Sequence, residues 1–235
     1  MHLNWPDCLN VRDLEGLPTA NGRRIAPGAL IRSDNLNRLT EAGIEAVRAA
    51  GVVRIVDVRT PPECAGYPSP FSTDPICHNM PLYNADDPYD PTLSLEEQYI
   101  LMVDQNPGLF AAAVGAIADA PDGAVVVHCH AGKDRSGTVV ALALSLAGVP
   151  REEVAADYAV LSDRMRDHFA EQVALVEDPT ERRELVESFT ARPETMLSLL
   201  THLETAYGGV KHYLRQGGLA DDQINSLRAR LVETG

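Results

Sequence analysis

The sequence is poor in several features that mark particular kinds of protein. Its four cysteines, Cys8, Cys64, Cys77 and Cys129, lack metal-ligand spacing and are few for a chain of 235 residues, which argues against a metal site or a disulfide framework. No apolar run approaches the length of a membrane span, and the opening MHLNWPDCLN has no basic segment followed by an apolar one. These absences predict reduced thiols in a cytoplasm, with neither an export signal nor stable membrane insertion.

Positive charge is also scarce. The chain has 20 basic residues against 34 acidic ones and a formal net charge of −14, and its only lysines are Lys133 and Lys211. Such a surface repels nucleic acid and anionic membranes over most of its area, which excludes a general binder of either. An anionic substrate would therefore have to be captured by a local positive pocket.

What the sequence does contain is an alternation of apolar strands and helices. VVRIVDVR (52–59) and ICHNMPL (76–82) have the pattern of buried strands, and AVVVHC (124–129) has the pattern of a third. A helix is expected within 39–51, with Thr40 as its N-cap and Gly51 at its end, and a buried helix is expected to end at Gly148. Strands that alternate with helices predict an α/β sheet fold.

The C-terminal part of the chain is helical by pattern. Segments 150–173, 192–209 and 220–234 have proline or acidic residues near their starts, and the second of them ends in two glycines. In the middle of the chain, residues 83–98 are rich in proline and aspartate, which predicts a loop.

The stretch VVVHCHAGKDRSG (125–137) brings reactive and charged side chains together at the end of an apolar strand. A strand, a tight loop with Gly132, and a helix direct several backbone N–H groups and a helix N-terminus at one point, and such a point binds anions. The stretch is not the GxxxxGK[ST] nucleotide loop, because Asp134 follows Lys133 and no glycine stands five positions before Gly132. Instead, five residues separate Cys129 from Arg135.

This spacing suits the attack of a thiolate on phosphorus. A loop of that length can curl with Cys129 at its base and Arg135 on its rim, so that the guanidinium takes two phosphate oxygens while the sulfur lies in line with the leaving oxygen. A neighbouring arginine and a helix N-terminus favour the thiolate, which is the nucleophilic form of cysteine. Ser136 is placed to hydrogen-bond the sulfur or to assist its departure.

The segment HCHAGKDRSG (128–137) resembles the signature loop of the cysteine-dependent protein-tyrosine phosphatases. It is most similar to that of the bacterial tyrosine and lipid phosphatases, which reads HCxAGKDR followed by threonine or serine and then glycine. NVRDLEG, LIRSDNLNRLTEAGI, IVDVRTPPE and RPETMLSLLTHLETAYGGV are similar to other blocks of this family, so the resemblance extends over most of the chain. Glu15 stands where a second glycine is usual, and Ser136 where threonine is more common.

The resemblance implies a fold, a mechanism and a set of site residues. The fold is protein-tyrosine-phosphatase-like, with a mostly parallel central sheet flanked by helices, in one phosphatase domain over 1–235 with a lid-like helical part over about 151–206. Cys129 attacks phosphorus and forms a phosphocysteine, which water then hydrolyses, while Arg135 and the loop amides hold the phosphate oxygens. No metal or cofactor is implied. The implied substrate-binding residues are His130, Ala131, Gly132, Lys133, Ser136 and Gly137.

The sequence offers more than one proton donor for the leaving oxygen. The family places an aspartate as general acid, and Asp134 lies on the loop next to Arg135. Asp86 and Asp87 are the alternatives, because they lie in a loop-like segment such as the one that supplies the acid in many tyrosine phosphatases. We favour Asp134, since the loop fixes its position relative to Cys129 and YNADDPYD lacks the tryptophan-proline-aspartate pattern.

Other residues near these motifs have structural interpretations. His128 is expected to orient the loop from behind, and His130 is equally a solvated rim residue or a substrate contact. Asp57 with Arg59, and Arg12 with Asp13, are expected to form structural pairs. Cys64 and Cys77 are expected to be inert, with a protective disulfide to Cys129 as the less favoured alternative.

Two rival functions share part of the pattern. A rhodanese-like sulfurtransferase also uses a cysteine in a curled loop, but the arginine at this spacing and Asp134 favour phosphate. A non-catalytic phosphate-binding module is disfavoured because nucleophile, arginine and acid are all present. The predicted function is phosphomonoester hydrolysis. The substrate is expected to be a phosphoprotein of the phosphotyrosine type, a phospholipid or a phosphorylated metabolite, and the Lys133–Asp134 pair is the family feature linked with phosphoinositides. Oligomeric state has no signal in the sequence.

Overall fold

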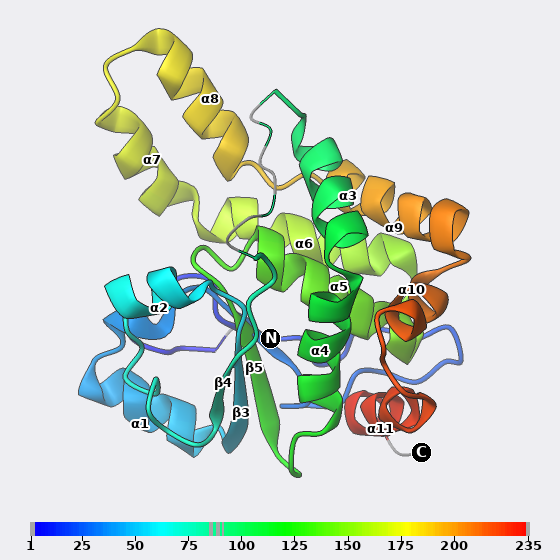
Figure 1. Cartoon of the computed structure of the whole chain (residues 1–235). Helices are drawn as coiled ribbons and strands as arrows, with labels where there is room; N and C mark the ends of the chain where they lie inside the picture. The colour runs from blue at the N-terminus through cyan, green and yellow to red at the C-terminus, as the bar shows by residue number, and fades with distance from the viewer. Residues whose placement is uncertain (1–2, 85–86, 88–89, 91, 234–235) are drawn as a thin grey trace.

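The computed structural model describes residues 3–84, 87, 90 and 92–233, and it is organised around one sheet (Figure 1). The strands in its described part are β1 (Arg12–Asp13), β2 (Ile31–Ser33), β3 (Val52–Asp57), β4 (Cys77–Asn79) and β5 (Ala124–His128). They lie in the order β1-β2-β5-β3-β4, and every neighbouring pair is parallel except β1 with β2. The predicted α/β fold with a mostly parallel sheet is confirmed.

Alternating side chains on the central strands divide the core into two parts. Val125 and Val127 of β5 face the larger apolar cluster, whereas Val126 between them faces the smaller one, as the period of two in a strand requires. The smaller side carries α1 (Glu41–Ala49) and α2 (Pro61–Gly66) (Figure 1). The larger side carries α3 (Leu95–Gln105), α4 (Pro107–Ala118), α5 (Asp134–Ala147), α6 (Arg151–Arg164), α9 (Pro193–Tyr207), α10 (Val210–Gln216) and α11 (Asp221–Leu231).

Two helix ends lie where the sequence predicts them, because a capping side chain or a glycine stands at each. Thr40 caps α1 by accepting a hydrogen bond from the Gly43 backbone, and α5 ends at Gly148 in the left-handed conformation. Almost every residue of α5 is buried, because the helix lies between β5 and the other helices of the larger cluster. The loop that joins β5 to α5 is therefore held at both of its ends by a buried element.

Several boundaries differ from the sequence expectations. The loop expected over 83–98 ends earlier, because Ser94 and Glu97 form a capping box that starts α3 at Leu95. The segment 150–173 is divided at Met165 into α6 and α7 (Arg166–Ala174). The sequence interpretation did not single out α4, α8 (Pro179–Phe189) or α10. Helices α7 and α8 extend away from the sheet as a hairpin (Figure 1).

No single helix in the described part of the chain has both the length and the apolar content to cross a membrane. Among the described residues, only the consecutive helices α3 and α4 have that length and apolar content when taken together, and they are bent by 83° at the break between them.

Candidate active site

The loop between β5 and α5 is tightly folded. Gly132 has a φ of +70°, and a Cβ there would lie 2.6 Å from the Ser33 carbonyl oxygen and 2.7 Å from the Asn10 amide nitrogen. Both the backbone conformation and the close approach therefore require glycine. We call residues 129–135 the signature loop.

The carbonyl groups of the signature loop are held from behind. Arg32 donates from Nε to the Gly132 oxygen and from Nη2 to the Lys133 oxygen, both at 2.9 Å. Asn10 donates from its side-chain amide to the oxygens of Ala131 at 3.3 Å and Gly132 at 3.2 Å. These bonds fix which side of the loop the carbonyl groups occupy.

Arg32 is itself held in a buried cluster with Arg12 and Asp157. The Asp157 carboxylate lies 2.8 Å from Arg12 Nε and 2.9 Å from Arg32 Nη1. Burial opposes ionisation of Asp157, but the two guanidinium groups outweigh it and hold its pKa below the ordinary value. The predicted pair of Arg12 with Asp13 is wrong, because neighbouring residues of a strand point to opposite faces. Asp13 instead accepts hydrogen bonds from two backbone N–H groups.

The backbone N–H groups of the signature loop contrast with its carbonyl groups. Those of residues 130–135 donate to no acceptor among the described residues, and α5 begins at Asp134, so that its N-terminus meets the same point. Several free donors around one helix N-terminus form an anion-binding cradle.

Cys129 lies at the base of this cradle. Its side chain is buried, and its Sγ is 3.3 Å from the Oγ of Ser136 in the first turn of α5. Gly137, the next residue, packs so closely on Arg32 that a Cβ would lie 2.6 Å from Nη2. The Gly137 N–H donates to the Lys133 oxygen at 3.0 Å, so it is already used.

Arg135 lies beside the cradle in a two-point ion pair with Glu63 of α2. The Nη1–Oε2 distance is 2.5 Å and the Nη2–Oε1 distance is 2.8 Å, and the two side chains are 15% and 30% exposed. Partial burial opposes ionisation of Glu63, but the bonds from Arg135 and Thr60 lower its pKa to about 2. The Arg135 guanidinium also lies 5.8 Å from the centre of the Tyr83 ring.

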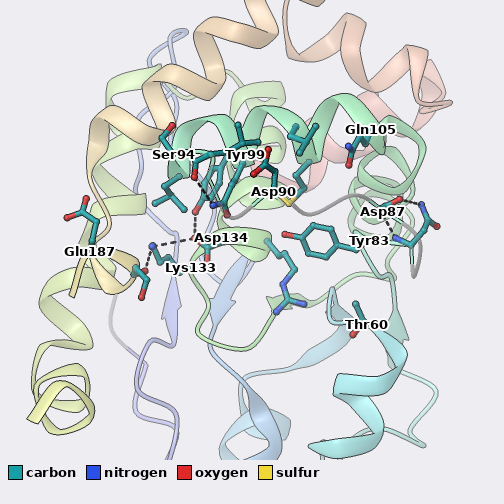
Figure 2. A pocket seen from close by; sticks show the side chains of 18 of the residues that line it. Thr60, Tyr83, Asp87, Asp90, Ser94, Tyr99, Gln105, Lys133, Asp134 and Glu187 are labelled. Carbon is teal, nitrogen blue, oxygen red and sulfur yellow. Dashed lines mark hydrogen bonds and ion pairs between the residues drawn. The ribbon is translucent and has the colours of Figure 1, made fainter. Parts of the chain in front are cut away.

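Asp134 and Lys133 are neighbours that face different surroundings. The Asp134 side chain is 42% exposed, and its Oδ1 accepts a hydrogen bond from the Tyr99 hydroxyl and lies 3.5 Å from Lys133 Nζ (Figure 2). Lys133 is buried, and its ammonium donates to the Ser188 carbonyl oxygen at the end of α8. Lys133 thus ties the signature loop to the α7–α8 hairpin.

The two histidines of the motif lie on opposite sides of it. His128 is fully buried, with Nδ1 3.2 Å from the Cys129 oxygen and Nε2 3.5 Å from Asp57 Oδ2, and burial lowers its pKa. Asp57 pairs with Arg59 at 2.5 Å, which confirms the expected structural pair. His130 is exposed at the rim, where its ring lies edge-on to that of Tyr67 with centroids 5.6 Å apart.

The remaining sequence candidates are Asp86, Asp87, Cys64 and Cys77. Asp86 is outside the described residues. Asp87 accepts hydrogen bonds from the Asn84 backbone at 2.7 Å and from the Asn106 amide at 2.8 Å. The four cysteines are free thiols, and burial raises the pKa of both Cys64 and Cys77 to about 11.

A groove of about 850 Å³ opens beside the C-terminal end of the signature loop, where Lys133, Asp134 and Arg135 line it. Figure 2 shows Tyr83 and Tyr99 on its walls, with Lys133 and Asp134 at one side. Its apolar lining comes mainly from α3 and the segment before it, and the two cations Lys133 and Arg135 line it together with acidic side chains. The acidic lining residues are Glu63, Asp87, Asp90, Asp134, Glu184 and Glu187.

Sequence reasoning did not single out Glu63 and Tyr99 of the groove, or Asn10, Arg32 and Asp157 behind the loop. Glu63 had a signal, because Thr60 and Glu63 form a capping box in the segment TPPE, but that signal indicates a helix start and not a partner for Arg135. The described residues contain no group of three or more histidine, cysteine, aspartate or glutamate side chains arranged to hold a metal ion.

Comparison with known proteins gives one consistent result. The model of the tyrosine phosphatase family matches residues 3–233. A tyrosine-protein phosphatase from Nostoc commune is 31% identical over 238 aligned residues, which cover 93% of this chain and 79% of that protein. The triple specificity protein phosphatase PtpB of Mycobacterium tuberculosis is 28% identical over 97% of this chain and 98% of its own length.

Proposed function

The chain belongs to the tyrosine phosphatase family, and from this premise we propose that it hydrolyses phosphomonoesters through a phosphocysteine formed on Cys129. The observation that carries the proposal is the position of the Cys129 sulfur at the base of a cradle of free N–H donors. The donors bind the equatorial phosphate oxygens, and the thiolate attacks phosphorus from below. Water then hydrolyses the phosphocysteine.

Arg135 and Ser136 have separate roles in this proposal. The Arg135 guanidinium remains charged, because its bonds to Glu63 outweigh its burial and raise its pKa, and its remaining N–H groups hold the transferring phosphoryl group. The Ser136 hydroxyl, at 3.3 Å from Sγ, hydrogen-bonds the thiolate when the phosphocysteine is hydrolysed.

We assign the general acid to Asp134. Its half-exposed carboxyl lines the groove next to the cradle, where it can reach a leaving oxygen. Asp87 is less suited, because hydrogen bonds from Asn84 and Asn106 overcome its slight burial and lower its pKa, which keeps it a carboxylate. The test compares Asp134→Asn, Asp86→Asn and Asp87→Asn on an alkyl phosphate, whose leaving group needs the acid. Asp134→Asn is expected to lose on the order of a hundredfold, and a larger loss in either of the other two would overturn the assignment.

The groove favours substrates with one phosphate on an aromatic or apolar leaving group. Its apolar wall suits a phosphotyrosine-type ring, whereas its acidic lining repels further phosphates and Lys133 is already bonded to Ser188. We therefore rank phosphotyrosine peptides above phosphoinositides and phosphorylated metabolites. We propose separately that the enzyme works in a cytoplasm. The relative from M. tuberculosis is named a triple specificity protein phosphatase, so phosphoserine and phosphothreonine peptides belong in the substrate panel beside phosphoinositides.

We also propose that α7 and α8 form a lid. Glu184, Glu187 and Ser188 of α8 line the groove. The sequence suggests two borders for the pocket, the segment from Tyr83 to Asp90 and the charged helices around Arg164 and Arg166. Tyr83 and Asp90 line the groove, whereas Arg164 and Arg166, at the junction of α6 and α7, are not among its lining residues. Hydrogen exchange in α8 is expected to slow when vanadate binds, and unchanged exchange would contradict a lid.

The cysteine mechanism is tested by phosphate release from p-nitrophenyl phosphate. Cys129→Ser is expected to lose on the order of a thousandfold or more, while Cys64→Ser, the matched control, keeps its activity. Vanadate is expected to compete with substrate, and EDTA to leave the rate unchanged. Activity in Cys129→Ser, or loss in EDTA that a metal restores, would overturn the mechanism. Phosphate binding without turnover would indicate a binding module, and transfer of sulfur from thiosulfate to cyanide would indicate a sulfurtransferase.

A further inference from the structure

Behind the Asp134 carboxyl lies a pair of buried tyrosines. Tyr99 of α3 is 3% exposed, and its hydroxyl donates to Asp134 Oδ1 (Figure 2). The Tyr158 hydroxyl, on α6, lies 2.9 Å from that of Tyr99 and has no other hydrogen-bond partner among the described residues. The two hydroxyls and the carboxyl thus form a row that runs from the core to the groove.

The protons of this row can point in only one direction. Burial raises the pKa of both tyrosines, so each keeps its single proton. If Tyr99 donated to Tyr158, the proton of Tyr158 would be buried without an acceptor among the described residues, which folded proteins avoid. Tyr158 therefore donates to Tyr99, and Tyr99 donates to Asp134.

This direction distinguishes the two carboxyl oxygens of Asp134. Oδ1 receives the Tyr99 proton and lies 3.5 Å from the Lys133 ammonium, so both of its neighbours are donors. A proton on Oδ1 would meet these donors and find no acceptor. Oδ2 has no protein partner among the described residues, and Asp134 lines the groove.

We propose that Tyr99, supported by Tyr158, is a positioning residue that holds the transferable proton of Asp134 on Oδ2, toward the leaving oxygen. The inference rests on the proposed function. As the bond from Cys129 Sγ to phosphorus forms, the bond from phosphorus to the leaving oxygen breaks and its electron pair stays on that oxygen. The oxygen takes the proton from Oδ2 and leaves Asp134 a carboxylate. When water attacks the phosphocysteine, a bond from its oxygen to phosphorus forms, and the bond from phosphorus to Cys129 Sγ breaks with its electron pair on the sulfur. Oδ2 takes a proton from the water, phosphate leaves, and the thiolate and the Asp134 acid are restored.

The test measures how the loss in Tyr99→Phe depends on the leaving group. With glycerol phosphate, an alkyl ester, kcat is expected to fall about tenfold, a part of the full contribution of a general acid. With p-nitrophenyl phosphate, whose leaving group departs without help, kcat is expected to change less than about threefold, and KM to change little for both esters. Tyr213→Phe is the matched control, since its buried hydroxyl donates to the Val103 oxygen and lies outside the groove lining.

A double variant separates positioning from a structural effect. In the Asp134→Asn background, Tyr99→Phe is expected to cost nothing further, because both changes act on one proton transfer. Equal losses on the two esters, or losses that multiply in the double variant, would overturn the inference. The same holds if Asp134→Asn itself has no dependence on the leaving group. If Tyr99→Phe does not fold, Tyr158→Phe gives the same comparison with a smaller expected loss.

The proposed function has its own point of failure. It fails if the unmodified chain releases no phosphate or if Cys129→Ser remains active. The positioning role fails if the chain works through Cys129 but the loss of kcat in Tyr99→Phe is the same for both esters.

Discussion

The signature loop has charged residues on both of its sides, and the two sets differ in their surroundings. Behind the loop, Arg12, Arg32 and Asp157 are buried, and their hydrogen bonds go to one another, to loop carbonyl groups and to other backbone or amide oxygens. On the groove side, Arg135 pairs with a Glu63 that is 30% exposed, and the Asp134 side chain is 42% exposed.

The difference separates charges that shape the loop from charges that act on a substrate. A buried ion is costly unless its partners remain, so the rear cluster is tied to the folded state. Altering a charge beside an exposed groove costs little free energy of unfolding, but that charge can contact a phosphate. We therefore expect rear substitutions to lower the free energy of unfolding and groove substitutions to lower the rate.

The largest expected effect is at the rear of the loop. Asp157→Asn removes the shared carboxylate of two buried guanidinium groups, which is expected to cost about 3–5 kcal/mol of the free energy of unfolding. The melting temperature should then fall by about 10 °C. Thermal unfolding measures this, with Asp163→Asn as the control, because Asp163 is an exposed carboxylate on the same helix. A melting temperature like that of the control would mean that the rear cluster is not a stability element.

The groove side is tested by Arg135→Lys. Lysine keeps one positive charge but cannot hold two phosphate oxygens in the plane of a guanidinium, so kcat/KM on p-nitrophenyl phosphate is expected to fall about a hundredfold to a thousandfold. The melting temperature should stay within about 2–3 °C, since the pair with Glu63 is partly exposed. Arg32→Lys makes the same change behind the loop. It should lower the melting temperature more than Arg135→Lys does and lower kcat/KM less. Similar loss of activity and of stability in both variants would remove the distinction between the two sides.

The same two sides explain how much of the site could be predicted from sequence. Cys129, Asp134 and Arg135 lie on one short strand-loop-helix unit, so their spacing carries their arrangement. Their partners come from distant positions: Glu63 is 72 residues from Arg135, Tyr99 is 35 from Asp134, and Asp157 is 145 from Arg12. No local pattern encodes such pairs, because tertiary packing brings them together.

Some features that were not predicted from the sequence do have local signals there, but other residues nearby favoured a different structure. The segment SLEE contains the capping box that starts α3, but the proline and aspartate residues before it favoured a loop through residue 98. The Arg12–Asp13 pair failed because adjacency in sequence places two strand side chains on opposite faces. The apolar strands and the buried helix α5 were predicted because their patterns repeat over whole elements.

The smallest expected effect concerns Glu63, whose pKa of about 2 lies below its ordinary value of 4.5. A carboxylate with a lowered folded pKa stabilises the protein above its unfolded pKa, and this contribution disappears as the pH falls through the folded one. Glu63→Gln should therefore lower stability at pH 7 by at most about 1 kcal/mol, and the difference from the unmodified chain should shrink between about pH 4.5 and pH 2. Melting curves over this range measure it, with Asp163→Asn again the exposed control. A difference that grows as the pH falls would have the wrong sign for a carboxylate stabilised by Arg135. Because the Glu63→Gln substitution retains the size of the side chain without its charge, a loss of kcat/KM far smaller than that of Arg135→Lys would show that the guanidinium acts on phosphate and Glu63 only orients it.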